Sequence, residues 1–332
     1  FSLSPPSPPL RFALSALRFL FRIALSPSAS RPSPTLLPMS LIVTGTIGID
    51  TVITPSGHGE KILGGSCTYF AAAASFYTPV RLVAAVGGAF PESFMGTLAR
   101  FRGIDLHGLE VRKNSKTFAW GGKYHANMNS RDTLFTELGV LAEAPPKVPT
   151  GYADSTVVFL ANTHPGVQLG FLDQLPKRVF TVADTMDLWI NIAKDELKTL
   201  LKRVDGLVLN YDEAELFTGK SNPVTAGRHI LEMGPKFVVI KKGEHGALLV
   251  HRDGIAAIPA YPTEQVVDPT GCGDTFAGGM MGSIASTAPT DGAKASSYET
   301  VRKALVHGTI VASFNIEAFS LDRLKTLDKA SL

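Results

Sequence analysis

A stretch of fourteen residues, Val266–Gly279, carries the groups in this chain that are best suited to chemistry. Gly271 and Gly273 allow the backbone to turn so that successive N–H groups point the same way. The small and apolar residues from Asp274 onward continue as a helix, and N–H groups at a helix N-terminus bind oxyanions and phosphates. We therefore expect Gly271, Cys272 and Gly273 to form an anion hole.

The aspartate of this stretch is restricted in what it can do. Asp274 cannot serve as a phosphate ligand, because like charges repel. It is well placed to take a proton from a hydroxyl group that attacks a phosphate, which is the role of a general base. The simpler alternative is a helix-terminal aspartate that follows an ordinary glycine turn, and this short motif alone leaves both readings open.

The complete stretch resembles the C-terminal signature of the PfkB/ribokinase family of carbohydrate and nucleoside kinases. The resemblance implies ATP-dependent phosphorylation of a hydroxymethyl group on a sugar or nucleoside, with ATP and Mg²⁺, and with Asp274 as the base. Asp268 and Thr270 match family positions that bind a monovalent cation, which makes K⁺ a further expected cofactor.

Two more motifs follow the order of the family. Asn210 and Glu213 lie where a strand passes into a helix and match an N-x-x-E motif, which implies that they organise magnesium and phosphate through water. The same spacing also satisfies a helix capping box. Lys241 and Gly243 match a strand–turn–strand segment that the family places against ATP, although Lys241 read alone is equally an exposed lysine at a strand end.

Four residues are expected on the acceptor side. Asp50 follows the first strand and matches an aspartate that holds sugar hydroxyls, a task that suits a carboxylate accepting two hydrogen bonds. Read alone, it is equally a turn residue. Gly64 and Gly65 precede an alanine-rich helix and resemble the family's N-terminal glycine pair, and Asn162 ends a later strand.

The acceptor motifs also depart from those of ribokinases. Ser66 and Tyr69 stand where ribokinases have lysine and asparagine, and Gly48 replaces an asparagine. These departures weigh against a ribose pocket like that of ribokinase.

Strands alternate with helical segments along residues 41–332, an order typical of a parallel sheet that gathers ligands at the carboxyl ends of its strands. The resemblance implies one α/β kinase domain there, a ribokinase-like three-layer α-β-α fold with a mostly parallel central sheet. A small β lid is expected from about 51–63 and 111–138. A helix over 298–314 is expected to close the adenine pocket.

Residues 1–38 differ from the rest of the chain. They contain four arginines and no acid, so they carry +4 of a total of +3 and leave −1 for the remainder. Arg11, Ser15, Arg18 and Arg22 share one face of a possible helix, which resembles an organelle transit peptide. In that case the protein is mitochondrial or plastid. If Met39 is the natural start, we expect a cytoplasmic protein with a disordered upstream segment.

Amino-acid composition limits the class of protein and the kinds of partner that we expect. The 332 residues are 45% hydrophobic and 18% charged, which is typical of a soluble globular enzyme. We expect a small-molecule partner, no nucleic acid, and either a monomer or a homodimer through the lid. No apolar run approaches the ~20 residues of a membrane span. Two cysteines far apart in sequence suggest a reducing compartment.

Two functional alternatives remain. One is a non-catalytic PfkB-like regulator or scaffold, although the chain keeps the base and both glycines of the anion hole. The other is a sugar-phosphate kinase, which needs a basic cluster near the lid, where Lys123 and Arg131 are the visible candidates. We expect His125, in the same zone, to be solvated or at the substrate edge.

Cys272 allows two expectations. Its place at a helix N-terminus favours a lowered thiol pKa and a reactive sulfur that bound ATP shields. The alternative is a small packed residue without reactivity.

Overall fold

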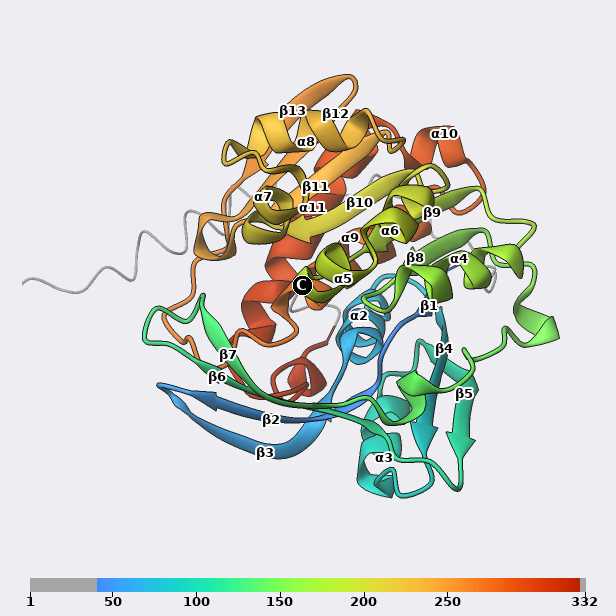
Figure 1. The fold of residues 1–332 in the computed structure, drawn as a ribbon, viewed down its shortest axis with the longest axis vertical. Helices are drawn as coiled ribbons and strands as arrows, with labels where there is room; N and C mark the ends of the chain where they lie inside the picture. The colour runs from blue at the N-terminus through green and yellow to red at the C-terminus, as the bar shows by residue number, and fades with distance from the viewer. Residues whose placement is uncertain (1–40, 329–332) are drawn as a thin grey trace, which may run out of the picture. The chain divides into compact units, whose positions relative to one another are not determined.

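The computed structural model describes residues 41–328, which contain a nine-stranded sheet and a separate four-stranded sheet (Figure 1). The expectations for residues 1–38 lie outside the described residues. Within the described part, no helix combines the length and the apolar character that crossing a bilayer requires.

The large sheet is parallel over most of its width. Its strands, in spatial order, are β13 (Gly254–Ile258), β12 (Ala247–His251), β11 (Phe237–Lys241), β10 (Gly206–Asn210), β9 (Phe180–Asp184), β8 (Val157–Leu160), β1 (Leu41–Thr44), β4 (Val80–Gly87) and β5 (Ile104–Arg112). The strands from β11 to β5 run parallel, and only β12 and β13 run antiparallel to their neighbours. Parallel strands that are covered on both faces have continuous runs of apolar residues in their sequences. The fully buried runs Leu41–Val43 and Leu207–Leu209 are examples.

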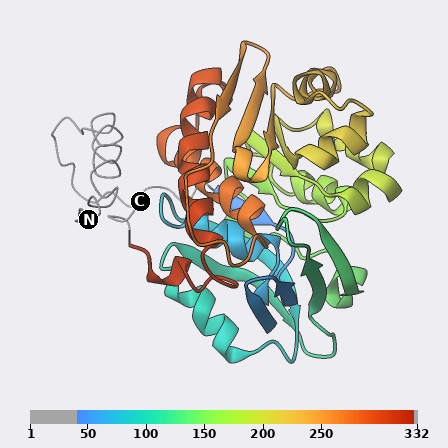
Figure 2. The same cartoon turned by 90° about the vertical axis from the view of Figure 1, so that its left-hand side faces the viewer.

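Helices cover both faces of this sheet, so the fold has three layers (Figure 2). Successive strand residues point to opposite faces. Val208 accordingly packs into one core, whereas Leu207 and Leu209 pack into the other. The first core also contains side chains of α2 (Ser66–Ala74), α3 (Glu92–Arg100), α9 (Cys272–Thr287), α10 (Gly292–Ala295) and α11 (Tyr298–Asn315). The second contains side chains of α4 (Pro165–Asp173), α5 (Asp187–Ile192), α6 (Lys194–Leu201), α7 (Tyr211–Thr218) and α8 (Pro223–Leu231).

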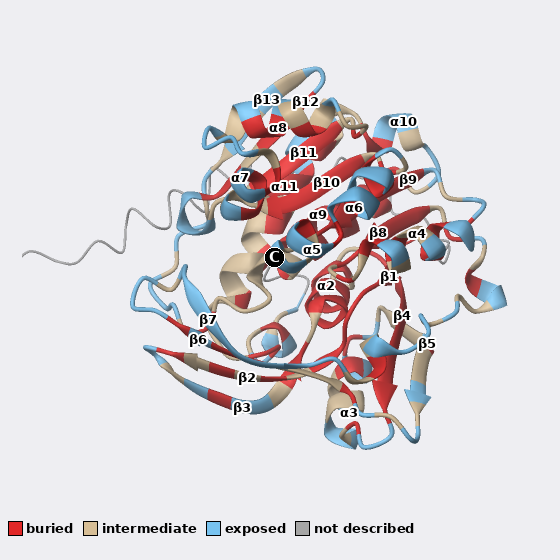
Figure 3. Ribbon diagram, in the orientation of Figure 1, coloured by how far each residue is buried: buried red, intermediate tan, exposed pale blue. Residues whose placement is uncertain are grey.

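Helix α9, which begins with the residues of the candidate site, is buried between two other helices. Figure 3 shows the central strands and α2 as buried, and the residues Thr275–Ala285 of α9 are buried as well. The glycine positions allow the close packing: a Cβ on Gly278 would lie 2.4 Å from the carbonyl oxygen of Phe70 in α2, and one on Gly279 would lie 2.7 Å from that of His307 in α11. The small residues after Asp274 therefore serve helix packing.

The four-stranded sheet, which falls on the segments expected to form the lid and is called the lid below, has the order β3 (Gly57–Gly64), β2 (Gly48–Thr54), β6 (Phe118–Tyr124) and β7 (Arg131–Glu137). Strands β2 and β6 are parallel, and the other pairs are antiparallel. The hydroxyl groups of Thr54 and Ser56 donate to the carbonyls of Val267 and Val266 at 2.8 and 2.7 Å. The β2–β3 hairpin is thereby fixed to the segment that leads into the candidate site.

Candidate active site

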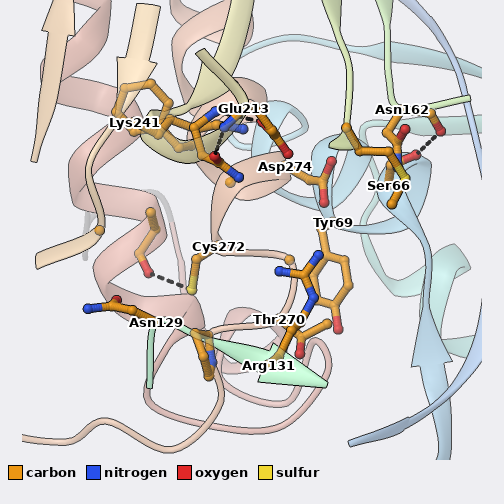
Figure 4. Close-up of a pocket in the computed structure, with 18 of the residues that line it drawn as sticks. Ser66, Tyr69, Asn129, Arg131, Asn162, Glu213, Lys241, Thr270, Cys272 and Asp274 are labelled. Atoms are coloured by element: carbon orange, nitrogen blue, oxygen red, sulfur yellow. Dashed lines mark hydrogen bonds between the residues drawn. The ribbon is translucent and has the colours of Figure 1, made fainter. Parts of the chain in front are cut away.

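A cavity of about 1650 Å³ opens at the carboxyl ends of the parallel strands and is lined by residues of both sheets. One wall comes from the ends of β9, β10 and β11 and from the start of α9, and another from lid strands β6 and β7. Figure 4 shows Glu213, Lys241 and Asp274 on one side of this space, with Asn129 and Arg131 entering from the lid. This is the strand edge at which parallel α/β sheets collect ligands.

The glycine turn has the conformation that an N-terminal anion site requires. Gly271 is the N-cap of α9 with φ +75°, a left-handed conformation that disfavours other residues. The Cys272 N–H donates to the Pro269 carbonyl at 3.2 Å. Among the hydrogen bonds of residues 41–328, the N–H groups of Gly271 and Gly273 have no acceptor. Of the three residues predicted for the anion hole, Gly271 and Gly273 therefore have backbone N–H groups free to bind a ligand, whereas that of Cys272 is already hydrogen-bonded.

A buried cation faces that turn. A Cβ on Gly273 would lie 2.9 Å from Lys241 Nζ, and this Nζ is 3.3 Å from Asp184 Oδ2. The Lys241 side chain is only 17% exposed, so the alternative of an exposed strand-end lysine is wrong. Burial acts to lower the pKa of Lys241, but the negative charges of Asp184, Glu213 and Asp274 raise it overall. The lysine is therefore charged at neutral pH.

Asp274 lies in the first turn of α9 and titrates far above an ordinary aspartate. Its pKa is raised to about 7, mainly by burial and also by the charge of Asp184, while the charge of Lys241 acts to lower it. A carboxylate that titrates near neutral pH can both accept and release a proton at that pH.

Asn210 and Glu213 make the reciprocal hydrogen bonds of a capping box. Asn210 Oδ1 accepts from the Glu213 N–H at 2.8 Å, and Glu213 Oε2 accepts from the Asn210 N–H at 2.7 Å. Glu213 also lines the cavity, and burial raises its pKa to about 7. The helix capping box that the sequence allowed is thus present. It uses one carboxylate oxygen of Glu213 and leaves the other outside the cap hydrogen bonds.

On the acceptor side, Asp50 is only 4% exposed and lies against the glycine pair. A Cβ on Gly64 would be 1.9 Å from Asp50 Oδ2, and the Gly65 N–H stabilises the carboxylate. Burial nevertheless raises the pKa of Asp50 to about 8, helped by the charges of Asp268 and Asp274. Asp50 Oδ1 is buried and has no hydrogen-bond partner among residues 41–328. An unsatisfied buried oxygen of this kind suits a ligand hydroxyl.

Asn162 lies two residues beyond β8 and also lines the cavity. Its Oδ1 accepts from Trp189 Nε1 at 2.9 Å, and its carbonyl accepts from Ser66 Oγ at 3.2 Å. The asparagine is therefore held in place from two sides.

The segment before the glycine turn holds a second unsatisfied carboxylate. Asp268 is fully buried, and its Oδ1 accepts from the Thr270 N–H at 2.8 Å. Its Oδ2 has no hydrogen-bond partner within the described part of the chain. Burial raises the pKa of Asp268 to about 6. Thr270 donates through its hydroxyl to the lid residue Tyr124 at 3.2 Å, and its carbonyl accepts from Asn315 at 3.0 Å.

The expectation of a lowered thiol pKa at Cys272 is wrong. Burial of the sulfur raises its pKa to about 12, because the favourable contact with Asn315 Nδ2 at 3.5 Å does not offset desolvation. The charges of Asp268 and Asp274 act in the same direction as burial. Cys272 is half-buried and lines the cavity, so the alternative of a small packed residue without reactivity stays a prediction.

The turn over residues 243–246 also carries a contact with the lid. Gly243 begins the short 3-10 turn Gly243–His245, and Asn129, at the tip of the β6–β7 hairpin, donates to Glu244 at 3.1 Å. Sequence reasoning gave Asp184, Tyr124 and Asn129 no role. Only Asp184 had a local signal, as a carboxylate at the carboxyl end of a strand.

Comparisons with known proteins agree with this geometry. Residues 176–322 match the model of the pfkB family of carbohydrate kinases. A cytidine kinase of Thermococcus kodakarensis is 31% identical over 275 residues, which cover 80% of this chain and 96% of that protein. The chain belongs to the PfkB family of carbohydrate kinases. The prediction of an ATP-dependent kinase of carbohydrates or nucleosides is thereby confirmed.

Solved structures of PfkB-type kinases share the fold. A Burkholderia thailandensis nucleoside kinase in complex with inosine has a TM-score of 0.68 at 19% identity, over 88% of this chain and 95% of that one. A putative ribokinase II of Escherichia coli in complex with ATP and Mg²⁺ has a TM-score of 0.66 at 20% identity, over 88% and 96%. The predicted ribokinase-like α/β fold is confirmed.

The glycine turn gives a first prediction. Gly271→Ala forces a Cβ to within 2.4 Å of the Tyr69 ring at φ +75°. We expect a loss of unfolding free energy of about 1–3 kcal/mol from backbone strain alone. Gly96→Ala in α3 is the matched control, because a Cβ there meets nothing within 4 Å. Chemical denaturation measures both, and equal stability of the two variants would contradict the assigned turn conformation.

Proposed function

We propose that Asp274 is the general base that takes the proton from a hydroxymethyl group of a sugar or nucleoside. The observation that carries the proposal is one half-buried carboxylate that lines the cavity from the first turn of α9, beside the Gly271–Gly273 turn and the charge of Lys241. The proton passes from the acceptor oxygen to Asp274 while that oxygen bonds to the γ-phosphorus of ATP. The bond from this phosphorus to the β,γ-bridging oxygen breaks, and ADP leaves.

The residues around the base fit the charge that develops. The turn contains the free N–H groups of Gly271 and Gly273, and the ammonium of Lys241 lies against it. These donors would stabilise the transferring phosphoryl group. Mg²⁺ bound to the nucleotide would neutralise phosphate charge and takes most of its ligands from phosphates and water. Asn210 and the free oxygen of Glu213 would hold its water ligands.

The two substrates would occupy opposite parts of the cavity. We assign ATP contacts to Lys241 and Gly243 and the closing of the adenine pocket to α11, because α11 residues line the cavity beside the 243–246 turn. On the acceptor side we assign Asp50, the Gly64–Gly65 pair and Asn162.

The alternatives have less support. A sugar phosphate needs a cluster of cations, yet among the described lid residues Arg131 lines the cavity and Lys123 does not. A non-catalytic scaffold does not require the buried charges that surround Asp274.

Asp274→Asn tests the base. We expect kcat to fall by about 10²–10⁴ with little change in ATP affinity, because a general base is lost while the phosphate site remains. Asp195→Asn, in the first turn of α6 outside the cavity, is the matched control. Coupled ADP-release assays give kcat, and near-normal turnover of the Asp274 variant would remove the assignment.

The pH profile tests the electrostatics. Asp274 acts as a base only when deprotonated, and its pKa is raised to about 7, so kcat/KM should fall below about pH 7. Lys241 lowers that pKa, so Lys241→Met should move the acid limb to higher pH. Glu213 also titrates near pH 7, and Glu213→Gln should keep the limb in place. A limb that follows Glu213 and not Lys241 would refute this reading.

Asp268 and Thr270 lead us to propose a K⁺ site. The buried Oδ2 of Asp268, which has no hydrogen-bond partner, fits a cation ligand. In tetramethylammonium buffer we expect low activity that K⁺ restores better than Na⁺, and Asp268→Asn should abolish the difference. Activity that is indifferent to K⁺ would rule the site out.

A further inference from the structure

The register of the lid places an aromatic face and one arginine toward the cavity. Trp120 of β6 is the partner of Asp50 of β2 in the parallel pair, so both side chains lie on the same face of the lid. Tyr124 and Arg131 are partners across the antiparallel β6–β7 pair and share that face. Together with Phe118, these four side chains line the cavity.

The Trp120 indole lies along its own strand. A Cβ on Gly122 would be 2.1 and 2.5 Å from two carbons of the indole, so only glycine leaves room for the ring there. The guanidinium carbon of Arg131 is 5.8 Å from the centre of this ring. The guanidinium of Arg131 thus lies over the ring of Trp120.

Arg131 is exposed, and among residues 41–328 no carboxylate lies within ion-pair distance of it. Figure 4 shows its side chain reaching from the lid into the pocket, on the side of Tyr69 and Asp274. A guanidinium placed in this way offers several N–H donors and a flat face. It suits a planar ligand that carries hydrogen-bond acceptors.

Lys123 is excluded from the same task. It pairs in register with Asp132, one residue out of phase with Tyr124 and Arg131, and it is exposed without lining the cavity. Arg131 without a second cation from the described lid residues in the cavity does not form the cluster of cations that a phosphate needs. An aromatic ring, in contrast, binds a nucleic acid base with about 1–3 kcal/mol per stacked base.

The position of Trp120 relative to Asp50 decides the class of acceptor. Neighbouring strands lie about 4.8 Å apart. A ring that stacks on Trp120 would therefore lie next to a sugar held by Asp50, close enough to be covalently attached to that sugar. Resting on the kinase function proposed above, we propose that the acceptor is a nucleoside whose base stacks on Trp120, with Arg131 donating to a carbonyl or ring nitrogen of that base. Arg131 is then the residue that separates nucleosides from free sugars.

Binding can be measured without catalysis, because Trp120 and Trp189 are the two tryptophans of the sequence. The full chain is titrated with cytidine, uridine, adenosine and inosine while its tryptophan fluorescence is recorded. We expect at least one nucleoside to quench the signal saturably. Trp189 also lines the cavity, so the quench should become clearly smaller in Trp120→Phe without having to vanish, and ribose and gluconate should not produce it.

Arg131→Ala should raise the nucleoside Kd roughly 10- to 100-fold, the range for losing a hydrogen bond to a charged donor, while the KM for ATP stays unchanged. Arg131→Lys should recover only part of the affinity, because an ammonium does not stack. Lys123→Ala is the matched control and should bind like the parent. Melting curves show that each variant is folded.

Several results would overturn the inference. They are quenching by ribose or gluconate equal to that by nucleosides, a quench of unchanged size in Trp120→Phe, or equal affinities of Arg131→Ala and Lys123→Ala. A chain that binds nucleosides but never forms ADP would instead refute the proposed phosphotransfer alone. A chain that phosphorylates free sugars without binding nucleosides would refute only the present inference.

Discussion

The site depends on one buried ammonium among carboxylates. Lys241 lies against the Gly273 turn and compensates Asp184, Glu213 and Asp274, three acids that burial alone would drive to their neutral forms. Leaving any such charge buried without its partner is costly. The end of β11, the ends of β9 and β10 and the start of α9 are therefore held in one arrangement by charge as well as by packing.

Helix packing also fixes the position of Asp274. Helix α9 can approach α2 and α11 closely because Gly278 and Gly279 face their backbones. Asn315, at the end of α11, also donates to the Thr270 carbonyl and so holds the turn that precedes the helix. The position of Asp274 is thus determined by residues outside the proton transfer that we propose, which is how rigid elements hold a functional group in place.

Much of the fold and part of the site could be predicted from the sequence. The Val266–Gly279 turn and the Asn210–Glu213 cap are local patterns, in which spacing along the chain determines geometry. The Lys241–Asp184 ion pair joins residues 57 apart, and the Asn129–Glu244 hydrogen bond joins residues 115 apart, so neither has a local signal. Cys272 shows the limit in a different way. Its place at a helix N-terminus is local, whereas the desolvation that raises its pKa comes from the surrounding fold.

The two hairpins of the lid are attached to the body differently. The β2–β3 hairpin is fixed beside the glycine turn through Thr54 and Ser56, whereas the β6–β7 hairpin reaches the ATP-side turn through Asn129 and Glu244. With ATP at the 243–246 turn and the acceptor under the lid, as we propose, a nucleotide that moves this turn also acts on the sheet beside the acceptor. Linkage then requires reciprocity: the factor by which one substrate tightens or weakens the other is the same in both orders of addition.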